Sequence, residues 1–140
     1  MRIRTRMIAL AVLILSLLPL AGCGTAKKEA AAAFEKECEI VLFQMEKLQN
    51  EIEKGQQCLD SGKEPLDPKL RTALEKKLEE ARAFRVEIPE MPKKTEDIIA
   101  ATEKLQEQKS AKLVGELRAV IEAFRKSVRE KADLDLRSGG

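Results

Sequence analysis

The stretch FEKECEIVLFQMEKLQNEIEKGQQCL, residues 34–59, decides the fold class of this chain. Its apolar residues follow one another in alternating steps of four and three, which places them along one face of an α-helix. Apolar residues at all of positions 40–43 widen this face and indicate burial between two neighbouring elements. The stretch predicts a helix from about residue 27 to between 54 and 60, with this seam: Phe34, Cys38, Val41, Met45, Leu48, Ile52, Gly55 and Leu59.

A second helix is expected after a turn cluster rich in Gly, Pro and Asp at residues 60–68. Asp67 is suited to the N-cap and Pro68 to the first helical position. This helix is expected from 68 to about 86, and Pro89 and Pro92 then predict an extended connector. Its inward face is formed by Leu70, Leu74, Leu78, Ala81 and Phe84.

A third helix is expected to begin at Thr95, which we interpret as its N-cap, with acidic residues in the first turn where they favour the helix dipole. Its first inward residues are Ile98, Ala101 and Leu105. A polar stretch at 106–112 separates these from a wide apolar stripe at 113–128. We interpret this stripe and the run at 40–45 as core before binding surface.

The polar stretch leaves two alternatives open. In the first, the third helix continues through it, and the fold is an all-α antiparallel bundle of three long helices. In the second, the chain turns near 109–112 with Ser110 as a cap, and a fourth helix descends. That turn would bring Val120 to Phe124 level with Val41 and Phe43.

The first 22 residues have a different composition from the rest of the chain. Arg2, Arg4 and Arg6 precede an uncharged apolar run at 7–18, which is typical of a secretory signal peptide and too short to span a membrane. The following Leu20-Ala21-Gly22-Cys23 resembles the lipobox of bacterial lipoproteins. The resemblance implies that the Cys23 sulfur receives a diacylglycerol and that the peptide is cut just before it.

The sequence therefore predicts a lipoprotein signal peptide at 1–22, a lipidated tether at 23–28, a single helical-bundle domain at 29–136 and a flexible tail at 137–140. The lipid on Cys23 would hold the protein at the membrane of the cell envelope. In lipoproteins of bacteria with two membranes, Asp after the Cys resembles a signal for inner-membrane retention. Gly24 occupies that position, which favours the outer membrane facing the periplasm, or the outer face of the cell membrane in bacteria with one.

Composition argues against several classes of function. Of the 26 basic residues three lie in the signal, which leaves 23 basic against 24 acidic residues and no electrostatic case for nucleic acid. The chain contains no His, the usual general base and the commonest transition-metal ligand. It also contains no glycine-rich phosphate motif. We expect no enzyme activity, no catalytic residues, no cofactor and no metal site.

Cys38 and Cys58 remain after lipidation of Cys23, and a pair of cysteines in an oxidising compartment suggests a disulfide. Twenty residues of continuous helix would separate them by about 30 Å, whereas a disulfide needs Cα atoms within about 7 Å. An internal disulfide, an intermolecular one and two reduced thiols all stay open, with the internal bond disfavoured.

Three functions fit these observations. The first is a helical binding or adaptor module for another envelope protein, which resembles the pilotin lipoproteins of secretion systems in architecture only. The second is a self-associating structural coiled coil, because the heptad seam resembles that of the major outer-membrane lipoprotein. The third, which is the least favoured because no catalytic motif supports it, is an envelope enzyme that would need a clustered pair of carboxylates in a cleft. We favour the first, with an unidentified envelope protein as partner and a homo-oligomer as an alternative.

Overall fold

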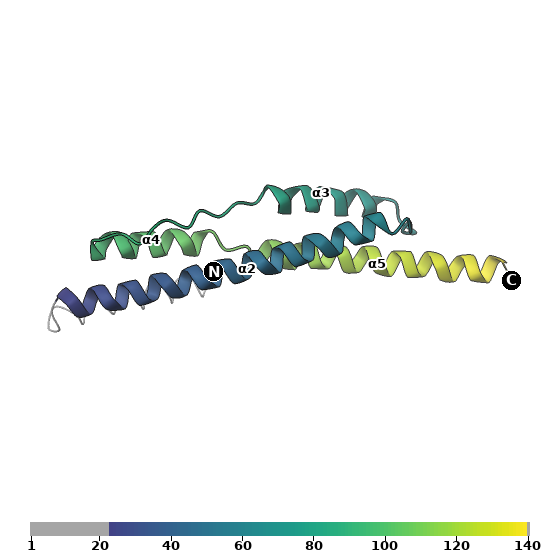
Figure 1. The fold of residues 1–140 in the computed structure, drawn as a ribbon. Helices are drawn as coiled ribbons and strands as arrows, with labels where there is room; N and C mark the ends of the chain where they lie inside the picture. Colours follow the sequence, from purple (N-terminus) through teal and green to yellow (C-terminus); the bar gives the residue numbers. More distant parts are fainter. Residues whose placement is uncertain (1–22, 140) are drawn as a thin grey trace. The chain divides into compact units, whose positions relative to one another are not determined.

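The computed structural model describes residues 23–139, and the predicted signal peptide at 1–22 lies outside them. Within the described range the chain forms four α-helices and no strand (Figure 1). The helices are α2 (Cys23–Asp60), α3 (Lys69–Ala83), α4 (Thr95–Glu107) and α5 (Ala111–Gly139). The all-α class that the heptad spacing predicts is confirmed.

The described residues divide into two compact units. The first unit contains residues 23–43 and 86–109, and the second contains residues 44–85 and 110–139. Helix α2 is continuous from Cys23 to Asp60 and therefore supplies residues to both. The sequence predicts a single domain over 29–136, whereas the structure divides this range between two units, each with its own apolar cluster.

The first unit packs the beginning of α2 with α4 and the connector that precedes α4. The connector is held by Gln108, whose Oε1 accepts a hydrogen bond from the Glu87 backbone N–H at 2.7 Å. The Gln108 Nε2 donates in return to the Glu87 carbonyl oxygen at 3.1 Å. The expected inward residues of α4, Ile98, Ala101 and Leu105, are confirmed. They form a buried cluster with three residues of α2: Ala30, Phe34 and Val41.

The second unit packs the end of α2 with α3 and α5. Helix α3 runs antiparallel to α5, because Lys77 in α3 pairs with Glu116 near the start of α5, while Leu66, ahead of α3, bonds to Ser127 further along α5. Most of the predicted inward residues of α3 and α5 are confirmed here. The buried cluster contains Leu48, Ile52, Cys58, Leu74, Leu78, Ala81, Leu113, Val114, Leu117, Ile121 and Phe124.

The predicted third helix is interrupted at residues 108–110, where α4 ends and α5 has not begun. This segment contains neither Gly nor Pro. Instead, polar side chains bond to its backbone: the Ser110 N–H donates to Gln44 Oε1 at 3.0 Å. The alternative of a break near 109–112 is therefore correct about the interruption.

The direction of α5 agrees with the three-helix alternative. Within the second unit α5 runs parallel to the end of α2, because Ser110 bonds to Gln44 and Arg118 bonds to Glu51. A descending fourth helix that brings Phe124 level with Val41 is therefore wrong. Phe124 instead packs in the second unit's cluster, and the stripe at 113–124 is covered by α3 and the end of α2.

Helix α2 buries a different face from the one expected at residues 40–43. Leu42 and Phe43 are each 57% exposed, so the expected burial of this run between two neighbours is wrong for both. The buried side of α2 includes a row of residues spaced seven apart. Four members of this row directly precede a residue of the predicted seam. This row consists of Ala30, Glu37, Gln44, Glu51 and Cys58; Gln44 is half-buried and the others are buried.

The helix ends agree with the turn chemistry in part. Helix α3 begins at Lys69 and has Pro68 at its N-cap, so the expected placement of Asp67 at the cap and Pro68 at the first helical position is wrong by one residue. The Asp67 Oδ1 still accepts a hydrogen bond from the Lys69 N–H at 3.0 Å. Thr95 is the first residue of α4 and not its N-cap; Lys94 occupies the cap position, without a side-chain bond. Helix α3 ends at Ala83 because Phe84 is extended, with ψ of 128°.

Candidate functional site

The predicted lipidation residue, Cys23, is the first residue of α2. Residues 24–28, expected as a tether, are also helical, as is the expected tail at 137–139. A lipid on Cys23 would therefore be joined directly to the first helix of the bundle. The lipidation itself stays a prediction.

A buried ion pair lies in the first unit between α2 and the end of α4. The Glu37 Oε1 lies 3.0 Å from the Lys109 Nζ, and the Glu37 side chain is 3% exposed. This oxygen accepts no hydrogen bond of good geometry. Lys109 is therefore the charge that compensates a carboxylate withdrawn from water.

A second buried glutamate lies in the second unit, two heptads further along α2. The Glu51 Oε1 accepts hydrogen bonds from Lys54 Nζ at 3.2 Å and from Arg118 Nη2 at 3.1 Å. Burial by itself raises the pKa of Glu51, but these two cations outweigh it and hold the pKa below its ordinary value. Glu51 therefore remains charged and joins α2 to α5.

These two glutamates were not singled out from the sequence, where they read as part of a solvated helix face. The signal that was available is the seven-residue spacing through Ala30, Glu37, Gln44, Glu51 and Cys58. Polar members of this row contact polar groups at or after the break between α4 and α5. One of these groups is the Ser110 N–H, which donates to Gln44. The Ser110 Oγ is itself buried without a hydrogen-bond partner among the described residues.

Cys38 and Cys58 are both free thiols on the same continuous helix. Their separation of 20 residues along α2 corresponds to about 30 Å, which no disulfide can bridge. Burial raises the pKa of the Cys38 thiol, and the charges of Glu35 and Glu37 raise it further. The pair is therefore not joined within the chain, and the Cys38 thiolate is disfavoured.

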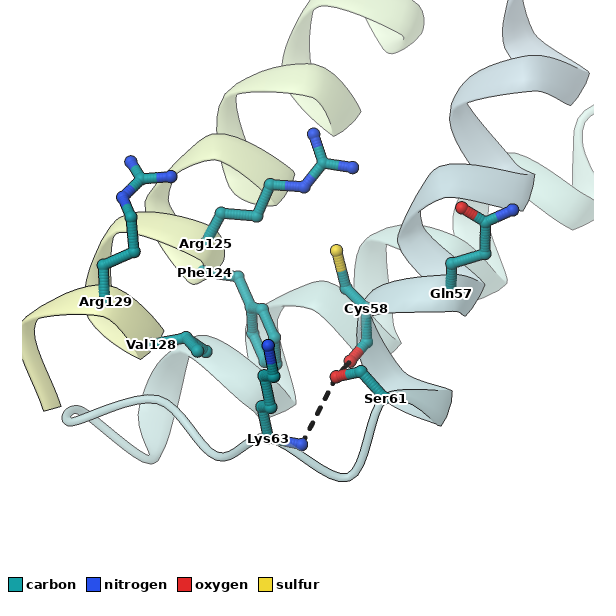
Figure 2. Close-up of a pocket in the computed structure, with 8 residues that line it drawn as sticks. All are labelled: Gln57, Cys58, Ser61, Lys63, Phe124, Arg125, Val128 and Arg129. Atoms are coloured by element: carbon teal, nitrogen blue, oxygen red, sulfur yellow. Dashed lines mark hydrogen bonds between the residues drawn. The ribbon is translucent and has the colours of Figure 1, made fainter. Parts of the chain in front are cut away.

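A recess in the second unit opens beside Cys58, between the end of α2, the turn after it and α5 (Figure 2). Its volume is about 280 Å³. The Cys58 sulfur points into it, and the Phe124 ring lies at its base (Figure 2). Its lining includes three basic residues, Lys63, Arg125 and Arg129. Sequence reasoning missed this recess because it depends on the packing of residues 66 positions apart.

Metal ligation and membrane crossing each require a recognisable arrangement of residues. The described residues contain no group of three or more His, Cys, Asp or Glu side chains that could hold a metal ion. None of the described helices combines the length and the apolar character that are needed to cross a membrane.

Comparison with known proteins adds no relative. No protein-family model matches the chain, and neither a curated protein nor a solved structure matches it.

Proposed function

We propose that this protein is a membrane-anchored lipoprotein of the cell envelope whose helical bundle acts as a binding or adaptor module for another envelope protein. The observation that carries the proposal is the Leu20-Ala21-Gly22-Cys23 motif after a basic and apolar leader. The structure adds that Cys23 begins α2. The anchor and the bundle would therefore meet without an intervening linker.

The anchor has a simple physical basis. A single acyl chain holds a protein only marginally at a bilayer, and stable attachment takes two signals. A diacylglycerol on the Cys23 sulfur supplies two chains. Gly24 after the lipidated residue favours the outer membrane facing the periplasm in bacteria with two membranes, and the outer face of the cell membrane otherwise.

A binding role is supported over self-association by where the heptad seam lies. In the second unit Leu48 and Ile52 are buried against α3 and α5, so this part of the seam is already covered by the chain's own helices. A coiled coil between copies would need the same residues. The recess beside Cys58 instead offers a concave surface whose apolar and cationic groups have room for a partner.

The three cysteines of the chain provide a matched test of the anchor. Cells that express the full chain would be grown with an alkyne analogue of palmitate, and membrane and soluble fractions would be compared. We expect label and membrane association in the wild type and in the controls Cys38→Ser and Cys58→Ser. Both should be lost in Cys23→Ser. Labelled Cys23→Ser in the membrane fraction would contradict the proposal.

A further inference from the structure

The recess beside Cys58 is built by the turn that follows α2. The Ser61 Oγ donates to the Cys58 carbonyl oxygen at 2.8 Å and accepts from the Lys63 N–H at 3.3 Å. Gly62 between them has a φ of +72°, a conformation that glycine adopts without strain. These contacts bring Lys63 back over the recess, where its side chain rises in front of Phe124 (Figure 2).

The floor of the recess is apolar and small. It is formed by Phe124 and Cys58, with Val128 one turn further along α5. At about 280 Å³ it lies just below the usual range of small-molecule pockets, which begins at roughly 300 Å³. A space of this size accommodates one large apolar side chain.

The rim of the recess carries an excess of positive charge. None of the described residues that line it is acidic, whereas three are basic: Lys63, Arg125 and Arg129. Within residues 23–139, neither Lys63 nor Arg129 has an ion-pair partner. Arg125 contacts Glu122 at 3.5 Å, and an exposed pair of this kind contributes little. The cluster therefore stands out in a mature chain whose charges nearly balance.

We propose that this recess binds an acidic peptide segment of the partner, with one large apolar side chain on Phe124 and flanking carboxylates on the three cations. The proposal rests on the binding role proposed above and names the chemistry of the partner. An apolar anchor in a pocket supplies most of the affinity of such contacts, and the surrounding charges provide steering and specificity. Binding should weaken as salt screens these charges.

The test uses residues 23–140 with Cys23→Ser, a chain that contains both buried clusters. The probe is a fluorescent nine-residue peptide with a central leucine and four acidic residues on each side, titrated by fluorescence anisotropy. One control peptide replaces the leucine with serine, and another replaces the acids with glutamine. We expect each control peptide to bind at least tenfold more weakly.

A matched pair of triple variants locates the site. The recess variant carries Lys63→Gln, Arg125→Gln and Arg129→Gln, and the control variant carries Lys36→Gln, Lys76→Gln and Lys104→Gln at exposed positions. Both lose the same net charge, and circular dichroism would check that both fold. We expect at least a tenfold loss of affinity for the acidic peptide in the recess variant and less than a twofold change in the control.

Equal affinities of the two variants, or no binding by the wild type at about 1 mM peptide, would overturn the proposal. Vesicles of phosphatidylglycerol provide a further arm: binding to vesicles that is lost in the recess variant, without peptide binding, would assign the rim to a lipid surface and also overturn it. None of these outcomes tests the proposed lipid anchor, because palmitate labelling of Cys23 is measured separately.

Discussion

The two compact units each bury a glutamate of α2, and they compensate its charge differently. Glu37 in the first unit depends on Lys109, which is itself four-fifths buried. Glu51 in the second unit is held by two cations, Lys54 and Arg118, whose side chains are about half exposed. Two glutamates at the same heptad position are therefore compensated in different ways. Glu37 pairs with one buried cation, whereas Glu51 pairs with two cations that are partly exposed to water.

The two units should therefore differ in how easily they open. The first unit builds its core from two helices and an extended connector, and its buried charge has one partner close by. The second unit surrounds its core with three helices, and its buried charge keeps one cation if the other is removed. We therefore expect the first unit to open at a lower free energy than the second.

The largest effects should come from the two cores. Leu78 in α3 and Ile98 in α4 are both fully buried, one in each unit. Truncation to alanine should cost about 3 kcal/mol in each case through lost burial and a residual cavity. Hydrogen exchange should show Ile98→Ala lowering the protection of α4 but not of α3, and Leu78→Ala lowering that of α3. Uniform loss along the chain in both variants would mean that the units do not open separately.

Removal of the Lys109 charge should have the next largest effect. Lys109→Ala leaves Glu37 buried without its cation, which should cost about 3 kcal/mol in urea unfolding. The matched change in the second unit, Arg118→Ala, should cost about 1 kcal/mol because Lys54 remains.

Replacement of both members of the first pair by leucine provides the control for this comparison. Glu37→Leu with Lys109→Leu should recover most of the lost stability, since a packed apolar pair avoids the cost of desolvating two charges. Equal losses in Lys109→Ala and Arg118→Ala would remove the distinction between the two glutamates.

The pH dependence of stability should report on Glu51 of the second unit. The pKa of Glu51 lies below its ordinary value, so its contribution is complete above the unfolded pKa of about 4.3 and is lost as pH falls through the lowered folded value. The free energy of unfolding should therefore fall below about pH 4. Glu51→Gln should show a flatter profile in this window, measured by urea titrations at several pH values. An unchanged slope in Glu51→Gln would contradict the network at Glu51.

The smallest effects concern two glycines of the second unit. A Cβ at Gly55 would lie 2.8 Å from Leu78 Cδ2, so Gly55 allows the close approach of α2 and α3. A Cβ at Gly115 would meet nothing within 4 Å. Gly115→Ala should therefore stabilise by up to about 1 kcal/mol through helix propensity. Gly55→Ala should destabilise by about 1 kcal/mol, because overpacking exceeds that gain. Thermal melts that rank the two variants in the opposite order would refute this packing.

Much of the fold could be predicted because it depends on local chemistry. The capping contact of Asp67 and the inward positions of Leu74 and Leu78 follow from turn signals and helical spacing. The exposure of Leu42 and Phe43 could not be predicted, because an apolar run does not specify which of its sides is buried. The interruption at 108–110 depends on distant partners such as Gln44 and Glu87.

Of the candidate functional residues, only the lipidation motif could be predicted from the sequence. The motif ending at Cys23 depends on adjacent residues, so the sequence suffices to propose it. The recess joins a turn at Ser61 and Lys63 to residues 124–129 of α5, more than 60 positions later in the sequence, and no local pattern indicates this contact. The burial of Glu37 and Glu51 could not be predicted, because glutamate on a helix is most often solvated.

We infer that this bundle covers its heptad seam with its own helices and that its recess binds a different protein. The most direct test is the mass in solution of residues 24–140 by light scattering, at high and low concentration, with and without reductant. We expect a monomer under all four conditions, since Cys38 and Cys58 are free thiols and each buried cluster is formed within one chain. A dimer or larger assembly would contradict it and favour the self-associating coiled coil.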